Sequence, residues 1–203
     1  MDPTTAIAAV HREVASTTHD GLPARMIVAE RAFPMPADEV WDALTNAERI
    51  PRWLMPISGE LRLGGRYQLE GNAGGTIETC DPPRHLGVTW EYGGAVSWVD
   101  VHLTDDRDGT RLRLEHVAHI DDDAQWKEFG PGAVGVGWDL TLLGLSEHLT
   151  TGGAVQADPT DAAGLEFMRR SSDEWGRASI ASGTPREEAE VAAARTTAAY
   201  TGG

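Results

Sequence analysis

The chain has 203 residues, a formal net charge of -15, 40% apolar residues and a single cysteine, Cys80. The negative charge argues against nucleic acid as a partner, because neutralising phosphates requires clustered Lys and Arg, and no stretch approaches the roughly 18 continuous apolar residues of a membrane helix. One cysteine cannot form an internal disulfide, and the first residues lack the pattern of a signal peptide. We therefore expect a soluble, cytoplasmic protein built around one well-buried domain.

The first quarter of the sequence predicts helices around one strand. Residues 4–16 are rich in alanine and place apolar side chains at helical spacing, which predicts an accessory helix in an N-terminal segment, 1–22. Residues 25–33 alternate and contain β-branched side chains, which predicts a strand. The run PMPADEVWDAL has an early proline and an acidic first turn, which is typical of a helix start, and a second short helix is expected after Asn46.

Between Gly59 and His119 the sequence changes to short alternating runs. They are ELRL, RYQLEG, GTIETC, HLGVTWEY, VSWVDVHL and TRLRLEHV. The turn residues between them predict an antiparallel meander, so with the first strand we expect about seven strands. A long helix is predicted over 133–150, and helices at 160–181 and 185–199 follow after a linker rich in Gly, Asp and Pro.

Several of these runs together carry a family resemblance. They are VWDALTNAERIPRWLMP, LRLGGRYQLEG, GTIETCDPPRHLGVTWEY, GTRLRLEHV and GWDLTLLGLSEHL. The chain resembles the START-like (SRPBCC, Bet v-like) superfamily over about 25–150, in the branch of the heat-shock-protein-90 ATPase activator homologues and most of all its actinobacterial single-domain members. The resemblance implies an α+β helix-grip fold, in which a curved antiparallel sheet wraps a long C-terminal helix and leaves a cavity. We expect this domain at 23–151 and a helical extension, 152–203, that packs on it.

The resemblance implies less about function than about fold, because members bind lipids, hormones, polyketides and other apolar molecules, and some catalyse cyclisation or hydrolysis. We expect a non-catalytic or weakly catalytic binder of a small apolar or aromatic molecule that uses no cofactor. An alternative is an enzyme of polyketide cyclase, aromatase or hydrolase type that uses the same cavity. A further alternative is a chaperone-related protein-interaction module.

The alternation of each strand predicts which side chains face the long helix, because side chains at i and i+2 share a face. Inward sets are expected at Tyr67 and Leu69, at 86, 88, 90 and 92, and at Leu112, Leu114 and His116. The expected ligand-binding residues are Trp53, Tyr67, Leu69, Trp90, His116, Trp138, Thr141 and Leu142. No catalytic residue is assigned.

His116 has two explanations, since a histidine on an apolar face needs a partner. It is either a core histidine bonded to a neighbour or a polar anchor for the ligand; in the enzyme alternative it would be the general base, together with Tyr67. His116 and His119 fall on opposite faces of a strand and no third ligand is evident, so no metal site is expected. Asp100 and His102 are predicted on the outer surface of their strand.

The long helix raises a question of its own, since Gly135, Gly137 and Gly144 should each cost about 1 kcal/mol relative to alanine. Either the backbone packs closely against a neighbouring element there, or the glycines leave space for a ligand beside Trp138.

The same helix carries two apolar stripes. One contains Trp138 and is expected to face the sheet: Val134, Trp138, Leu142, Leu145 and Leu149. The second consists of Val136, Leu140 and Leu143. We expect the N-terminal helix or the tail around Phe167 and Trp175 to cover it; otherwise it would mark a homodimer contact.

Overall fold

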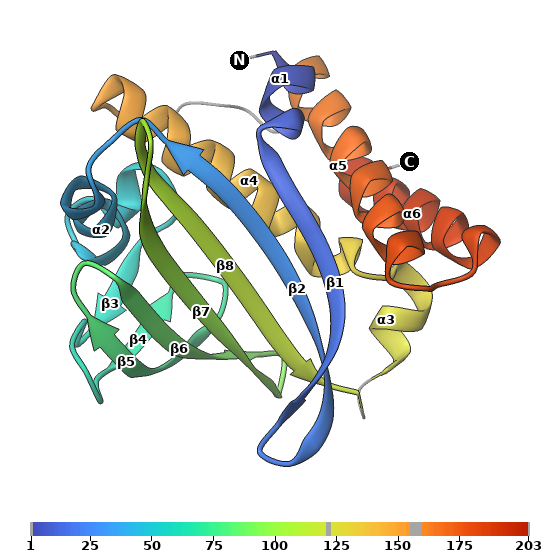
Figure 1. The fold of residues 1–203 in the computed structure, drawn as a ribbon, viewed down its shortest axis with the longest axis horizontal. Coiled ribbons are helices and arrows are strands. Elements are labelled where there is room, and N and C mark those ends of the chain that lie inside the picture. The colour runs from blue at the N-terminus through green and yellow to red at the C-terminus, as the bar shows by residue number, and fades with distance from the viewer. Residues whose placement is uncertain (1, 121–122, 155–159, 203) are drawn as a thin grey trace. The chain divides into compact units, whose positions relative to one another are not determined.

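The structure is a computed structural model that describes residues 2–120, 123–154 and 160–202. Its elements are α1 (Pro3–Ala8), β1 (Val10–His19), β2 (Leu22–Phe33), α2 (Ala37–Thr45), the 3-10 helix η1 (Ile50–Arg52), β3 (Ile57–Gly59), β4 (Arg66–Leu69), β5 (Gly74–Asp81), β6 (His85–Tyr92), β7 (Ala95–Asp106), β8 (Gly109–His119), α3 (Asp123–Phe129), α4 (Gly132–Thr151), α5 (Ala162–Ala181) and α6 (Arg186–Thr201) (Figure 1). The fold is α+β, as expected. None of its helices, over the residues described, is long and apolar enough to cross a membrane.

The strands follow the order β1-β2-β8-β7-β6-β5-β4-β3, and β3 to β8 pair antiparallel. The predicted meander is therefore confirmed, with eight strands instead of about seven. The run ELRL is not a strand; the strand lies just before it, at β3.

The eighth strand corrects the prediction of a helix over 4–16, because the helix α1 ends at Ala8 and Val10–His19 form β1. The missed signal is Asp20-Gly21, two residues between β1 and β2 that both have positive φ, at 50° and 76°. A two-residue Asp-Gly loop of this kind joins antiparallel strands, and this tertiary pairing overrides the helix propensity of an alanine-rich segment.

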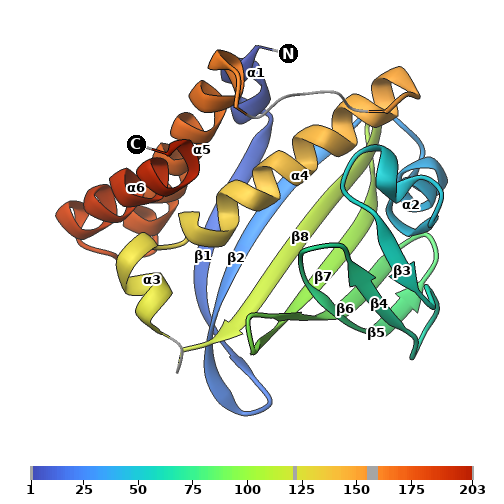
Figure 2. The same ribbon diagram turned by 180° about the vertical axis from the view of Figure 1, so that it is seen from behind.

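The described chain divides into two compact units. The first comprises Met1–Ala29, His119–Leu143 and Gln156–Gly203, and the second comprises Glu30–Ala118 and Gly144–Val155. In the first, α1 and β1 contact α5, and α5 lies beside α6 (Figure 2). The second contains β3 to β8 together with α2 and the C-terminal part of α4.

The second apolar stripe of α4 is covered within the first unit. Leu140 and Leu143 pack against a buried cluster formed by Ala6 and Ile7 of α1 and Phe167 of α5, and Val136 is fully buried. The predicted cover is thus confirmed for both the N-terminal helix and the tail, and the stripe needs no second copy of the chain.

The other stripe is buried at four of its five positions: Trp138, Leu142, Leu145 and Leu149. Val134 is 36% exposed, so its assignment to the buried stripe was wrong. It lies in the first turn of α4, although Gly132 and Gly135 on either side of it are buried.

Two glycines of α4 are explained by close packing. A Cβ at Gly135 would lie 2.3 Å from Cε2 of Trp175, and a Cβ at Gly144 would lie 2.6 Å from the carbonyl oxygen of Trp53. Each glycine therefore lets a neighbouring element approach the helix backbone. At Gly137 a Cβ would meet only the Tyr200 hydroxyl at 3.5 Å, an ordinary contact.

These contacts predict opposite effects for two substitutions on one helix. Gly135→Ala is expected to lower the free energy of unfolding by about 1–3 kcal/mol, because the buried indole of Trp175 cannot move aside without strain. Gly137→Ala is the matched control, and it should leave stability unchanged or raise it by up to about 1 kcal/mol. Urea denaturation of both variants measures the difference; equal effects would contradict the packing explanation.

Candidate functional site

The candidate site begins with an apolar cluster on one face of β4, β5 and β6. Tyr67, Leu69 and Ile77 are its buried centre. The partly buried side chains packed against them are Leu54, Met55, Ile57, Leu61, Cys80, Leu86, Val88 and Trp90. On β4, buried Tyr67 and Leu69 alternate with exposed Arg66 and Gln68, as a strand with one buried face requires.

The side chains predicted to share one face on β4 and on β6 do lie together in this cluster, with one exception. Tyr92, at the end of β6, is 60% exposed and does not belong to it. Leu86, Val88 and Trp90 contact the cluster but remain only partly buried. This face of β6 therefore keeps apolar surface that the described residues do not fully cover.

His116 of β8 lies beside this face. Its register partner on β7 is Val99, and its ring centroid is 6.3 Å from that of Trp90. Its Nε2 is 2.7 Å from the Ser97 hydroxyl, which in turn donates a hydrogen bond to the Trp90 carbonyl at 3.2 Å. With the Ser97 proton in that bond, the neutral ring donates from Nε2 to the Ser97 oxygen; in the other tautomer Nε2 accepts the Ser97 proton instead.

Burial controls the charge state of His116. The side chain is 8% exposed, and burial lowers its pKa to about 4. The imidazole is therefore neutral at neutral pH. The explanation of His116 as a core histidine with a hydrogen-bond partner agrees with these contacts, and a base with so low a pKa is a weak proton acceptor.

Tyr67 is a fixed donor. Its hydroxyl donates to the Thr89 carbonyl at 2.8 Å, and burial raises its pKa above the ordinary value. The phenol stays protonated at neutral pH and holds β4 against β6 across β5. It is thereby occupied in structure rather than available for proton transfer.

Trp53 follows η1 and is 8% exposed. Its indole N–H donates to the Ala43 carbonyl of α2 at 3.0 Å, and its own carbonyl lies against Gly144. These contacts fix the connection between α2 and β3.

The three remaining predicted residues lie on α4, in the first unit. Trp138 and Leu142 are buried, and the Thr141 hydroxyl donates to the Gly137 carbonyl at 2.8 Å. The structure thus brings Tyr67, Leu69, Trp90 and His116 together within the second unit. A ligand-binding role remains a prediction for all eight residues.

Sequence reasoning missed a buried polar cluster in the first unit. Oδ2 of Asp139 on α4 accepts hydrogen bonds from Arg12 at 2.9 Å, Ser171 at 2.5 Å and Trp175 at 3.1 Å. Burial raises the pKa of Asp139, while the Arg12 charge and the hydrogen bonds lower it. An aspartate inside the apolar run GWDLTLL was the available signal, since an acidic residue on a buried helix needs a partner.

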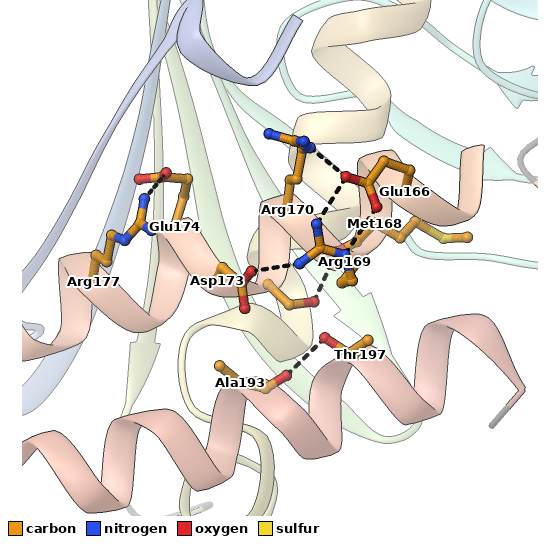
Figure 3. A network of polar contacts seen from close by, with 10 residues as sticks. Glu166, Met168, Arg169, Arg170, Asp173, Glu174, Arg177, Ala193 and Thr197 are labelled. Atoms are coloured by element: carbon orange, nitrogen blue, oxygen red, sulfur yellow. Dashed lines mark hydrogen bonds and ion pairs between the residues drawn. The ribbon is translucent and has the colours of Figure 1, made fainter. Parts of the chain in front are cut away.

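The outer side of α5 carries a different, solvent-exposed network (Figure 3). Glu166 accepts hydrogen bonds from Arg169 and Arg170, which lower its pKa to about 2, and Arg169 also pairs with Asp173. Glu174 and Arg177 form a further pair one turn along. Pairs at these spacings support a surface helix and do not form a site.

Comparison with known proteins places the fold in a family. The model of the family described as "Activator of Hsp90 ATPase homolog 1-like protein" matches residues 34–150. The crystal structure of CalU16 from Micromonospora echinospora is 32% identical and covers 84% of this chain and 98% of its own, with a TM-score of 0.68. The protein MLL2253 from Mesorhizobium loti is 25% identical, with 62% and 97% covered and a TM-score of 0.56. No curated protein matches the chain.

A further neighbour shows likeness in fold alone. DynU16, described as a protein in the dynemicin biosynthetic locus, is 20% identical, with 72% of this chain and 49% of its own covered and a TM-score of 0.53. The helix-grip fold and the resemblance expected from the sequence are both confirmed by these matches. The chain belongs to the family of Activator of Hsp90 ATPase homolog 1-like proteins, within the START-like superfamily.

Proposed function

We propose that the chain binds a small apolar or aromatic molecule against the inward face of β6, next to Trp90 and His116. The observation that carries the proposal is the incomplete burial of Leu86, Val88 and Trp90 on a face whose neighbours form a buried core. Apolar area that a fold leaves partly accessible beside a few placed polar groups is typical of a small-molecule site.

The polar groups beside this face suit a largely apolar ligand. Burial lowers the pKa of His116 to about 4 and Ser97 is an uncharged hydroxyl, so neither carries a net charge that a ligand would have to match. A planar aromatic molecule would gain area and ring contacts from Trp90. Membership of a family with a helix-grip fold supports the same kind of ligand.

An enzyme that uses His116 as general base is less well supported. Burial lowers the pKa of His116 to about 4, and Nε2 is engaged by Ser97. Catalysis would favour a base whose pKa lies nearer the working pH.

The proposal is tested with a matched pair of tryptophan variants. Trp90 pairs with Ser97 and Trp98 pairs with Thr89 across β6 and β7, so the two indoles face opposite sides of the sheet. We expect quenching of tryptophan fluorescence by a member of a panel of steroids, fatty acids and polycyclic aromatic compounds. Trp90→Leu should weaken the binding of that compound by about fivefold or more, because an aromatic contact contributes about 1 kcal/mol beyond its area, whereas Trp98→Leu should not.

Native mass spectrometry of the purified protein provides a second readout, the mass of any copurified molecule. Equal weakening by Trp90→Leu and Trp98→Leu would place binding elsewhere on the chain. Absence of binding across the whole panel, together with a ligand-free native mass, would contradict the proposal.

A further inference from the structure

Two histidines and an aspartate meet on the outer face of β6 and β7, away from the apolar cluster. They are His85, His102 and Asp100, and their ligand-type atoms all lie within 4.8 Å of one another. Val99, Val101 and Leu103 alternate with them on β7 and are buried, so Asp100 and His102 occupy the outer face, as the sequence predicts. All three side chains of the cluster are partly exposed and open to solutes.

The register of the two strands creates the cluster. His85 is the direct cross-strand partner of His102, and Gly87, two residues along β6, is the partner of Asp100. The two imidazole rings stack with centroids 4.1 Å apart and planes at 22°. Nε2 of His85 is 2.6 Å from Oδ1 of Asp100.

The residue opposite Asp100 allows the carboxylate to lean across the strands. A Cβ at Gly87 would lie 2.8 Å from Oδ1 of Asp100, closer than side chains normally approach. Glycine at this position therefore leaves the space in which the carboxylate reaches His85.

The neighbouring cations are already neutralised by carboxylates. Arg84 pairs with Asp81, the cross-strand partner of His85, at 3.0 Å. Arg113, the partner of His102 on β8, pairs with Glu115 at 2.7 Å and with Glu30 at 3.5 Å. The negative charge of the whole chain also favours the approach of a cation.

We propose that His85, His102 and Asp100 bind one divalent transition-metal ion, for which Zn²⁺ is the suitable probe. Two imidazoles and one carboxylate are the donor set that such ions prefer, whereas Mg²⁺ and Ca²⁺ prefer oxygen ligands alone. Ligand atoms bound tetrahedrally to one Zn²⁺ ion at about 2 Å lie roughly 3.3 Å apart, so the ligand atoms of the cluster close by up to about 1.5 Å on binding. The two stacked rings also turn, so that their nitrogen lone pairs meet at the ion. The ion takes the place of the hydrogen bond between Nε2 of His85 and Oδ1 of Asp100, and three protein ligands leave a fourth position for water.

Sequence analysis did not find this site because the rest of β6, a turn and the first residues of β7 separate His85 from the other two residues. Neither HLGVTWEY nor VSWVDVHL has the spacing of a metal motif by itself. The imidazoles meet because the register of β6 and β7 places His85 directly opposite His102. A register shifted by one residue would place them on opposite faces of the sheet.

The test is calorimetric titration of chelator-treated, tag-free protein with ZnCl₂. We expect one ion per chain with a dissociation constant in the micromolar range or below. His102→Ala and Asp100→Asn should each weaken binding by at least about tenfold, because each removes one ligand. His11→Ala removes an exposed histidine of β1 and is the matched control, expected to bind like the wild type.

Circular dichroism of each variant checks that the fold is retained. Asp100→Asn keeps the shape of the side chain, so it still tests the proposal if His102→Ala folds poorly. Absorption bands of bound Co²⁺ report the ligand set independently. No uptake of Zn²⁺ by the wild type, or equal affinity of the wild type and both ligand variants, would overturn the proposal. A loss of binding in His11→Ala would do so as well, since it would place the ion elsewhere.

Discussion

Replacing Asp139 by alanine is expected to lower the free energy of unfolding by about 3–5 kcal/mol, the largest effect of any single substitution considered for this chain. Asp139 is fully buried, and its partner Arg12 has a side chain only 5% exposed. Removing the carboxylate leaves the guanidinium buried without its counter-charge, and the donors of Ser171 and Trp175 lose their acceptor.

The cluster already contains polar atoms without partners among the described residues. Nη2 of Arg12 is a buried donor without an acceptor, and Oδ1 of Asp139 is a buried acceptor without a donor, among the described residues. The pair is therefore not an optimised source of stability. Replacing both charges by apolar side chains of similar volume, as in Arg12→Met with Asp139→Leu, should recover the part of the loss that comes from the unpaired guanidinium, since buried ion pairs often contribute little net free energy. The part that comes from the donors of Ser171 and Trp175 remains.

A double-mutant cycle measures the coupling between the two charges. It compares the free energies of unfolding of Arg12→Met, Asp139→Leu and the double variant, each from urea denaturation. Ser171→Ala provides a graded comparison that keeps both charges and should cost about 1–3 kcal/mol. Asp173→Ala, which removes a surface partner of Arg169, is the control and should cost less than about 1 kcal/mol. Additive single effects, with no recovery in the double variant, would contradict the coupling.

The fold could be predicted from local pattern wherever the pattern and the tertiary contacts agree. Alternation in TRLRLEHV and VSWVDVHL gave the correct buried faces, because each of these strands has one buried side. The prediction failed at residues 10–19, where helix-favouring alanines stand in a segment that pairs as a strand. The Asp20-Gly21 turn brings this segment back beside β2, and the pairing with β2 stabilises the strand over the helix.

The candidate site was predictable only in part for a related reason. The alternation of side chains along β8 predicts the face on which His116 lies. Its partner Ser97 lies on β7, and this contact can be found only when the register of the two strands is known. The same holds for His85 and His102. Burial of Asp139 had a signal in the sequence, yet the identity of Arg12 as its partner, 127 residues away, had none.

Acidification is expected to destabilise the protein through His116. The pKa of its imidazole is about 4 in the folded chain against an ordinary value of 6.5, so the unfolded chain binds the proton more readily. Above about pH 6.5 the imidazole is neutral in both states, and protonation costs no stability. As the pH falls from about 6.5 toward about 4, the unfolded chain takes up the proton first and the free energy of unfolding decreases. Between about pH 7 and about pH 5 the loss amounts to roughly 2 kcal/mol, from about 1.4 kcal/mol for each unit of pKa difference.

The variant His116→Gln separates this effect from the titration of carboxylates. Its side-chain amide can still donate to Ser97 but cannot take up a proton, so its stability should fall by about 2 kcal/mol less than that of the wild type over the same pH interval. His11→Gln, at an exposed position, should behave like the wild type. Denaturation at both pH values gives the comparison, and the NMR shift of the ring gives the pKa directly. A measured pKa of His116 near the ordinary value of 6.5 would show that solvent reaches the imidazole. The surroundings of Trp90 would then not be the neutral, apolar ones from which we infer an uncharged ligand.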